Sequence, residues 1–132
     1  MIQEQYGLTE TTTMSAREAE AAIRAALAEE GFGILTEIDV TATFNAKLGI
    51  DYRPYKILGA CNPQLAHEAL GADDRIGLLL PCNVIVMESD GGETVVSILD
   101  PNVMETVANE DAISGVAAEA RSRLMRALQA IS

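Results

Sequence analysis

The spacing of apolar and polar residues predicts that strands and helices alternate along most of the chain. Residues 4–13 are rich in threonine and alternate modestly between polar and apolar side chains, which is typical of an edge or half-buried strand. Ser15 and Glu18 then have the spacing of a capping box, so we expect a helix to begin here. Apolar residues recur at helical spacing from Ala19 onward, and Gly31 is expected to close the helix in the left-handed conformation.

A second strand is predicted over residues 33–39, where the pattern changes to alternation. Ile34 and Ile38 are expected on one face of this strand, and Glu37 and Asp39 on the other.

The middle of the chain predicts three short elements. A short helix is expected over residues 41–48, and a short apolar strand over residues 56–61. A further helix is expected over residues 63–70, because Asn62 is a favourable N-cap and Pro63 suits the first helical position.

The last part of the chain predicts a hairpin and a long helix. Residues 77–88 form an apolar run that predicts a buried strand, which Pro81 interrupts at a bulge or at an unpaired edge position. A Ser-Asp-Gly-Gly turn leads into another strand over residues 93–99, and the final helix is expected from about Glu110. The order β-α-β-α-β-α-β-β-α predicts an α+β (mixed α/β) fold, in which helices cover a face of about five strands.

Composition narrows the classes of protein that this chain can belong to. Its 132 residues suit one domain, and no apolar run approaches the ~20 residues of a membrane span. Nine Lys and Arg stand against twenty Asp and Glu, a net charge of −11, which disfavours nucleic acids and anionic membranes as partners. The first residues lack the pattern of a secretory signal, and two cysteines are too few for a disulfide scaffold. We therefore expect a cytoplasmic protein with reduced thiols.

The two cysteines are the first candidates for chemistry, because each of them precedes an asparagine. Cys61 is expected at the end of a strand and directly before a helix, where backbone N–H groups stabilise a thiolate; it could equally pack as a small apolar residue. Cys82 lies in an apolar strand, where burial raises the pKa of a thiol. If the two strands are neighbours, the cysteines could pair.

Other polar residues near these cysteines allow weaker hypotheses. Cys61, His67 and Cys82 could offer three metal ligands, but their spacing matches no known metal motif, and no metal or other cofactor is expected. Asn62 is explained as a helix cap. Asn83 is expected inside an apolar strand, where its amide would bond the backbone near Pro81, a second subunit or a ligand.

Basic residues gather in the segment that precedes the first cysteine. Lys47, Arg53 and Lys56 lie within ten residues, next to Tyr52 and Tyr55. This segment is either an anion-binding rim, in which the arginine recognises a carboxylate or phosphate, or an ordinary solvated loop.

Three stretches of the sequence resemble a known family. The segments "KLGIDYRPY", "YKILGACNPQLAHEAL" and "IGLLLPCNVIVME" are similar to the pattern of domain-of-unknown-function (DUF) family number 302, or DUF302. The resemblance covers nearly the whole chain. It implies a compact α/β fold and a homodimer, and it brings no assigned activity. It marks Cys61–Pro63 and Pro81–Asn83 as signature positions.

Together these observations favour a homodimeric domain that binds a small molecule or anion. Its pocket is expected near Cys61–Pro63 and Pro81–Asn83, with charge from Arg53 or Lys56 and further contacts from the ligand-binding candidates Lys47, Tyr55, Asn62 and Asn83. The first alternative is a thiol-based redox or metal-binding protein that uses Cys61 and Cys82, which are the candidates for catalysis. The second alternative is a structural or interaction module, and the sequence leaves open whether any reaction is catalysed.

Overall fold

The strands form one antiparallel sheet in the computed structural model, which describes the backbone of residues 2–108 and 111–132. The sheet has six strands in the order β1-β2-β6-β5-β4-β3, and every neighbouring pair is antiparallel. The strands are β1 (Ile2–Glu4), β2 (Gly7–Thr12), β3 (Gly33–Asp39), β4 (Tyr55–Cys61), β5 (Cys82–Glu88) and β6 (Thr94–Leu99). The predicted α+β class is confirmed, and the additional strand is the short β1.

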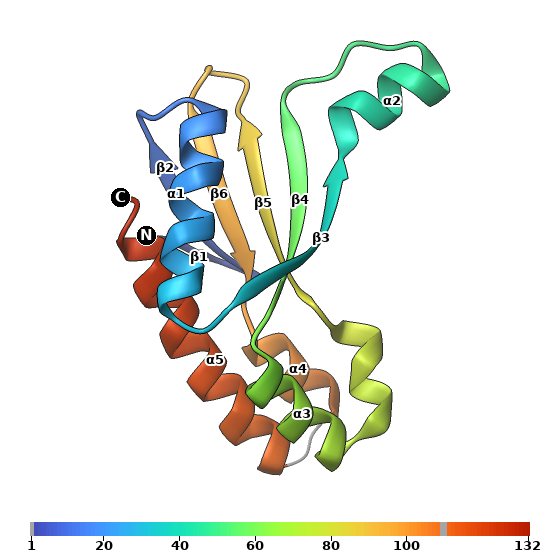
Figure 1. The fold of residues 1–132 in the computed structure, drawn as a ribbon, viewed down its shortest axis with the longest axis vertical. Helices are drawn as coiled ribbons and strands as arrows, with labels where there is room; N and C mark the ends of the chain where they lie inside the picture. The colour runs from blue at the N-terminus through green and yellow to red at the C-terminus, as the bar shows by residue number, and fades with distance from the viewer. Residues whose placement is uncertain (1, 109–110) are drawn as a thin grey trace.

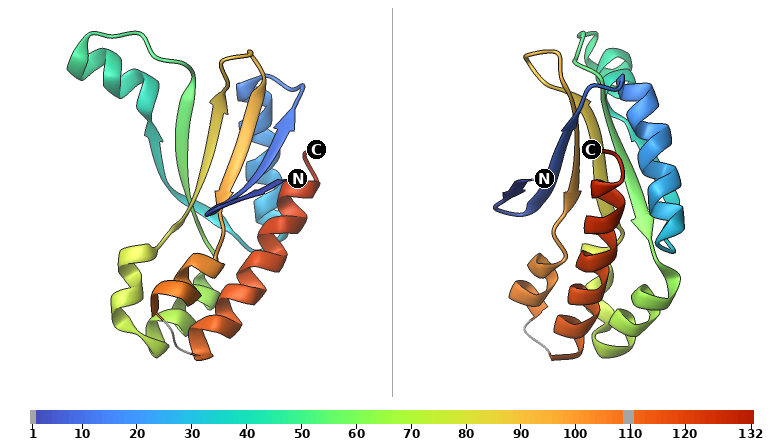
Figure 2. Two further views of the ribbon diagram at one scale, coloured as in Figure 1. Left: turned by 180° about the vertical axis from the view of Figure 1, so that it is seen from behind. Right: turned by 90° about the vertical axis from the view of Figure 1, so that its left-hand side faces the viewer.

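The helices divide between one face of the sheet and its two ends. They are α1 (Ala16–Glu29), α2 (Val40–Leu48), α3 (Pro63–Ala72), the 3₁₀ helix η1 (Asp74–Leu79), α4 (Asn102–Ala108) and α5 (Asp111–Gln129). Figure 1 shows α3 and α4 at one end of the molecule and α2 at the opposite end. In the right-hand view of Figure 2, α1 lies on one side of the sheet and the β1–β2 hairpin bends towards the other. No helix within the described residues is long and apolar enough to cross a membrane.

The core lies between the helix-covered face of the sheet and the apolar sides of α1 and α5. Alternate residues of the central strands point into it, because side chains in a strand alternate between the two faces. The core residues that are fully buried include Leu58, Val84, Val96 and Ile98 of the sheet, Ile23 and Leu27 of α1, and Leu124 and Leu128 of α5.

The predicted start and end of the first helix are confirmed. The Ser15 hydroxyl accepts a hydrogen bond from the Glu18 amide at 3.1 Å, and the Glu18 carboxylate accepts one from the Ser15 amide at 3.2 Å. Gly31 follows the helix with φ at +84°. This left-handed conformation favours glycine, which has no Cβ to collide with the backbone.

The predicted facing of β3 is wrong, because the strand contains a bulge that its sequence pattern does not show. The register shifts between Ile34 and Thr36, so that Ile34 lies opposite Ala60 while Glu37 lies opposite Leu58. Since Ala60 and Leu58 both point into the core, Ile34 and Glu37 share the helix-covered face, and Ile38 points to the other.

The predicted strand over residues 77–88 is also wrong in its first half. Residues Asp74–Leu79 form the 3₁₀ helix η1, and the strand begins only at Cys82. Pro81 therefore precedes the strand rather than interrupting it, and the Leu80–Pro81 peptide bond is cis. Pro81 cannot donate to a ladder, which agrees with its position outside the paired residues.

Near the C-terminus, helix α4 was not predicted from the sequence. It follows Asp100 and Pro101 directly, and the short apolar pattern of this segment did not reveal it. The final helix is confirmed from Asp111 onward, and its expected start at about Glu110 lies outside the described residues.

Strand β3, helix α2 and the loop that returns to β4 form an arm, residues 33–54, that extends from the body of the molecule (Figure 1). Helix α2 buries none of its residues, and β3 is an edge strand with one free backbone edge. Among the described residues, five of the nine large apolar side chains that are exposed lie on the arm: Leu35, Ile38, Leu48, Ile50 and Tyr52. The arm therefore presents an unusual concentration of uncovered apolar surface.

Candidate functional site

The two cysteines lie beside each other at the end of the sheet where α3 begins. Ala60, the residue before Cys61, pairs with Cys82 across the β4–β5 ladder, and both thiols line the same cavity. This cavity has a volume of about 30 Å³, and its other walls are largely apolar, including Phe32 and Met104. It has about the volume of one water molecule, so the pocket expected beside the Cys-Asn pairs is not large enough for a ligand.

The cysteines are free thiols in different surroundings. Cys61 is half-buried and Cys82 is buried. Burial raises the pKa of the Cys82 thiol to about 11, and the charge of Cys61 adds to the shift. The reactive thiolate of Cys82 is therefore scarce at neutral pH.

The proposed third metal ligand does not join the cysteines. His67 is exposed on α3. Within residues 2–108 and 111–132, no three His, Cys, Asp or Glu side chains lie close enough together to hold a metal ion. Cys61, His67 and Cys82 thus do not form a donor set in this part of the chain.

The two asparagines of the signature have separate positions. Asn62 is buried and caps α3 as predicted, since its Oδ1 accepts a hydrogen bond from the Leu65 amide at 3.2 Å. The expectation that Asn83 is buried is wrong, because the side chain is exposed opposite Gly59. Helices cover only the other face of β5, and the sequence pattern did not reveal which face Asn83 occupies.

The glycine and the proline of the signature segments pack against each other. A Cβ atom built on Gly59 would collide with Oγ1 of Thr36 and would lie 2.7 Å from Cγ of Pro81. Gly59 is therefore required by close packing between β4, the bulged strand β3 and the entry to β5.

The three basic residues of the predicted rim have different surroundings. Arg53 forms an ion pair with Asp90 in the β5–β6 turn and lies 5.9 Å from the centre of the Tyr52 ring. Lys47 is exposed on α2, and neither Lys47 nor Arg53 lines the cleft around Lys56. The structure therefore brings Lys56 and Tyr55 into one hollow and leaves the other two basic residues outside it.

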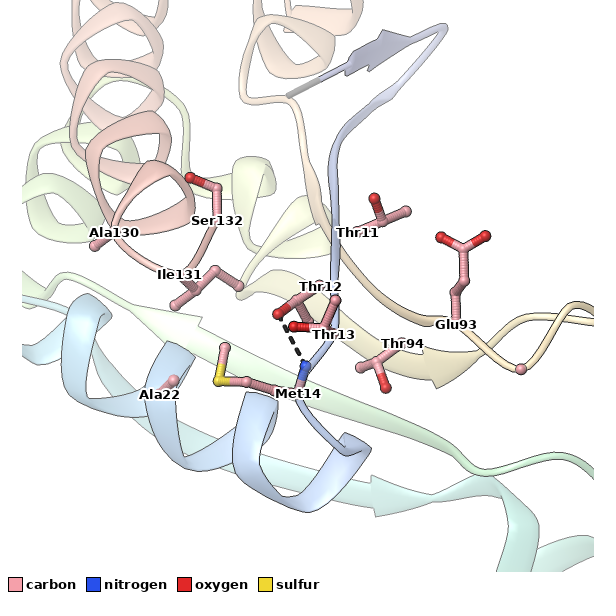
Figure 3. Close-up of a pocket in the computed structure, with 11 residues that line it drawn as sticks. Thr11, Thr12, Thr13, Met14, Ala22, Glu93, Thr94, Ala130, Ile131 and Ser132 are labelled. Atoms are coloured by element: carbon pink, nitrogen blue, oxygen red, sulfur yellow. Dashed lines mark hydrogen bonds between the residues drawn. The ribbon is translucent and has the colours of Figure 1, made fainter.

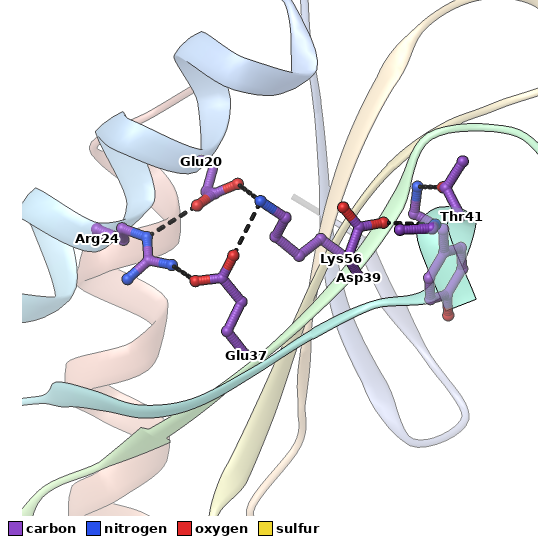
Figure 4. A network of polar contacts seen from close by, with 8 residues as sticks. Glu20, Arg24, Glu37, Asp39, Thr41 and Lys56 are labelled. Carbon is purple, nitrogen blue, oxygen red and sulfur yellow. Dashed lines mark hydrogen bonds and ion pairs between the residues drawn. The ribbon is translucent and has the colours of Figure 1, made fainter. Parts of the chain in front are cut away.

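Lys56 belongs to a ring of four charges that connects α1 with the arm (Figure 4). Its ammonium lies 3.0 Å from a carboxylate oxygen of Glu20 and 3.0 Å from one of Glu37. Arg24 closes the ring, at 3.0 Å from Glu20 and 2.7 Å from Glu37. This charge ring compensates Lys56, so that the lysine is not available as the sole positive charge of an anion site.

The pKa values within the charge ring reflect these contacts. The hydrogen bond and charge of Lys56 hold the pKa of Glu37 below its usual value, and the hydrogen bonds of Glu20 and Glu37 raise the pKa of Lys56. Glu37 and Lys56 therefore remain charged around neutral pH.

Beside the charge ring lies a cleft between the N-terminal half of α1 and the base of the arm. We call it the arm cleft. Its volume is about 390 Å³, and it is lined by Ala16, Arg17, Glu20, Asp39, Thr41, Pro54, Tyr55, Lys56 and Val86.

Hydrogen bonds fix the wall that the arm contributes to this cleft. Asp39 caps α2 by accepting from the Ala42 amide at 2.9 Å. The Thr41 hydroxyl donates to the Arg53 carbonyl at 2.7 Å and accepts from the Tyr55 amide at 2.9 Å. The arm cleft therefore has a defined wall, and the sequence revealed only its Tyr55 and Lys56.

The sequence held one signal for the charge ring, which is the i,i+4 spacing of Glu20 and Arg24. The position of Glu37, their partner on β3, depends on the bulge.

A hollow larger than the arm cleft lies elsewhere, between the end of α5, helix α1 and the β2–β6 ends of the sheet (Figure 3). It has a volume of about 880 Å³, and three consecutive threonines, Thr11 to Thr13, contribute to its walls. Glu93 is the one charged side chain among its lining residues. A hollow with no cation among these residues does not suit the anion that the sequence favoured.

Comparisons with known proteins agree with the resemblance that the sequence showed. The crystal structure of the uncharacterized conserved protein DUF302 from Bacillus stearothermophilus is similar to this chain, with a TM-score of 0.90 and 28% identity. The match covers 98% of this chain and 100% of that one. A search of curated proteins finds no match. The family model described as "Domain of unknown function DUF302" matches residues 8–131, and the chain therefore belongs to that family.

Proposed function

We propose that this protein binds a small polar molecule in the arm cleft. The observation that carries the proposal is the composition of this cleft, where charged side chains of both signs and a hydroxyl line one hollow. Its volume of about 390 Å³ lies within the roughly 300–1,000 Å³ typical of small-molecule sites. The cysteine cavity of about 30 Å³ offers no comparable space.

The position of the cleft also supports this role. One wall belongs to α1 in the body and the other to β3, α2 and the start of β4. A ligand that contacts both walls would restrain the arm relative to the body. Binding would therefore favour one position of the arm over others.

Titration of the protein with a library of small polar fragments tests this proposal. We expect a subset of fragments to shift the NMR signals of the Thr41, Tyr55 and Lys56 amides and to raise the melting temperature. An Arg17→Gln variant removes one charged group from the cleft lining and should weaken fragments that bind to the guanidinium, without unfolding the protein, because this side chain is exposed. If fragments bind only at other surfaces, or none binds, the arm cleft is not the functional site.

A second candidate function is self-association through the arm, and a different observation supports it. The free edge of β3 and the exposed Leu35 and Ile38 beside it suit strand pairing with a second copy of the chain. A two-fold axis would cover both edges with one contact, since the same surface is then used twice. The homodimer that the sequence resemblance implies is thus proposed here to form through the arm.

The thiol hypothesis has less support. The high pKa of Cys82 disfavours it as a nucleophile or as a resolving partner for Cys61. In the cytoplasm, where we propose that the protein resides, both cysteines would remain reduced and would serve mainly as small packing residues.

A further inference from the structure

We propose that the ligand of the arm cleft is a small zwitterion, with a cationic group that binds Asp39 and an anionic group that binds Arg17. The inference rests on the proposed function and adds the chemical class of the molecule. A free amino acid, with its ammonium and carboxylate, is the simplest member of this class.

Arg17 is the residue of the cleft that would bind the anionic group of the ligand. It lies in the first turn of α1 and lines the cleft, and it makes no ion pair or hydrogen bond with any residue that the structure describes. A cation in this position is opposed by the positive end of the helix dipole. Twenty acidic residues are present in the chain, yet none of those described is paired with this guanidinium. An incoming carboxylate would satisfy it with two parallel hydrogen bonds.

Asp39 is the corresponding group for a cation. One of its carboxylate oxygens caps α2 at 2.9 Å, and within the described residues the other oxygen has no hydrogen-bond or ion-pair partner. Figure 4 shows Asp39 at the base of the arm, next to Lys56 and away from the pair formed by Arg24 and Glu37. An ammonium group would give the second oxygen a charged partner without disturbing the cap.

The remaining charges of the cleft balance each other. The Lys56 Nζ lies 3.0 Å from Oε1 of Glu20, and this ion pair is part of the charge ring. The lining therefore contains two cations and two carboxylates, and Arg17 and Asp39 are the exposed groups among them. A ligand of a single sign would gain a charge-assisted hydrogen bond from only one of these two groups, whereas a molecule with both charges would gain one from each.

Matched ligands and matched variants test this inference. We would titrate the protein with free α-amino acids and ω-amino acids, and with their N-acetyl and methyl ester derivatives, at a slightly acidic pH where the ester amine is charged. The N-acetyl compounds retain only the anion and the esters only the cation. The variants are Arg17→Gln and Asp39→Asn, and asparagine keeps the capping oxygen. Arg75→Gln is the control, since its side chain is 86% exposed and lies on η1, outside the cleft lining.

The expected result is that at least one zwitterion shifts the NMR signals of the cleft and binds about tenfold more tightly than either of its derivatives. Arg17→Gln should remove the advantage over the ester, and Asp39→Asn the advantage over the N-acetyl compound, while Arg75→Gln changes neither.

Three results would overturn the inference, and the third would also overturn the proposed function. If a derivative of one sign binds in the cleft as tightly as its parent, the ligand is not a zwitterion, although the cleft remains a binding site. If no zwitterion shifts the cleft signals while polar fragments do, the ligand class is wrong and the proposed function stands. If neither the zwitterions nor the fragments bind there, the proposed function fails as well.

Discussion

Single residues decide how the signature segments of this chain pack. Gly59 leaves room for Thr36 and Pro81, Asn62 caps a helix, and the thiol of Cys82 is enclosed by apolar side chains. At this scale the repeated Cys-Asn pairs are explained by two different environments, one at a helix start and one at the start of β5, where Cys82 is buried and Asn83 is exposed.

Replacing Gly59 by alanine should destabilise the protein. The new Cβ would collide with Thr36 and with the ring of Pro81, which cannot move independently of the backbone. We expect a loss of roughly 2–3 kcal/mol in the free energy of unfolding, measured by urea denaturation.

Gly115→Ala is the matched control for this substitution. Gly115 lies inside α5 with nothing within 4 Å of the added Cβ, so alanine should stabilise the helix by about 0.5–1 kcal/mol. Equal effects of the two substitutions would show that close packing at Gly59 is not what requires the glycine.

The Cys82 thiol should make stability depend on pH in the alkaline range. Its native pKa of about 11 lies above the ordinary 9.0, so the unfolded chain loses this proton first as the pH rises. The contribution is therefore complete below pH 9.0 and is lost as the pH rises through about 11, by up to roughly 3 kcal/mol. Denaturation of Cys82→Ala across this range should give a flatter profile than the natural protein gives.

Alkylation provides an independent check on the same residue. Native Cys82 should react with iodoacetamide only after unfolding, whereas half-buried Cys61 should react earlier. Rapid modification of Cys82 in the native protein at neutral pH would contradict this account and would restore the thiol hypothesis.

At the scale of helices and strands, the sequence predicts an element correctly where the signals for that element are local. Helix α1 was predicted because its capping box and apolar spacing are local signals, and the same holds for Asn62 and Pro63 at the start of α3. The bulge in β3 and the 3₁₀ helix η1 were missed, because contacts with other segments decide both. The arm cleft was predicted only in part, since its two walls are distant in sequence and meet through the sheet.

The charge ring is expected to hold the arm against α1. Lys56→Met would leave Glu20 and Glu37 facing each other with Arg24 as their one cation in the ring, and should weaken the attachment of β3 by about 1 kcal/mol. Hydrogen exchange of the β3 amides should become faster, while the amides of β6 change little.

Lys47→Met is the control, because Lys47 is exposed on α2 and lies outside the charge ring.

The charge ring should also make stability depend on pH in the acidic range. Because Lys56 lowers the pKa of Glu37, the contribution of Glu37 is present above the ordinary value of 4.5 and is lost as the pH falls through the lower native pKa. A carboxyl titration in which Glu37 has its usual pKa in the natural protein would contradict this.

At the scale of the whole molecule, packing against the body leaves the apolar side chains of the arm uncovered. A chain of this size can bury most of its large apolar side chains, yet Leu35, Ile38, Leu48, Ile50 and Tyr52 of the arm remain exposed. A second copy would cover them, and the acidic net charge of −11 means that apolar contact must outweigh repulsion between the copies.

Two lysine substitutions distinguish the arm from other exposed apolar positions. Ile38→Lys places a charge beside the free edge of β3 and should dissociate the proposed dimer, although it makes the chain less acidic. Leu78→Lys changes a side chain that is 88% exposed on η1 and should leave the proposed dimer intact. Dissociation by both variants, or by neither, would exclude the arm as the specific interface.

The most direct test of the account is the mass of the natural protein in solution, measured by sedimentation equilibrium over a range of concentrations. The chain has a mass of 14.0 kDa, and we predict that the sedimenting species has twice this mass at micromolar concentrations. A species of 14.0 kDa at every concentration would contradict the role of the arm, because its apolar surface would then remain exposed in the functional protein.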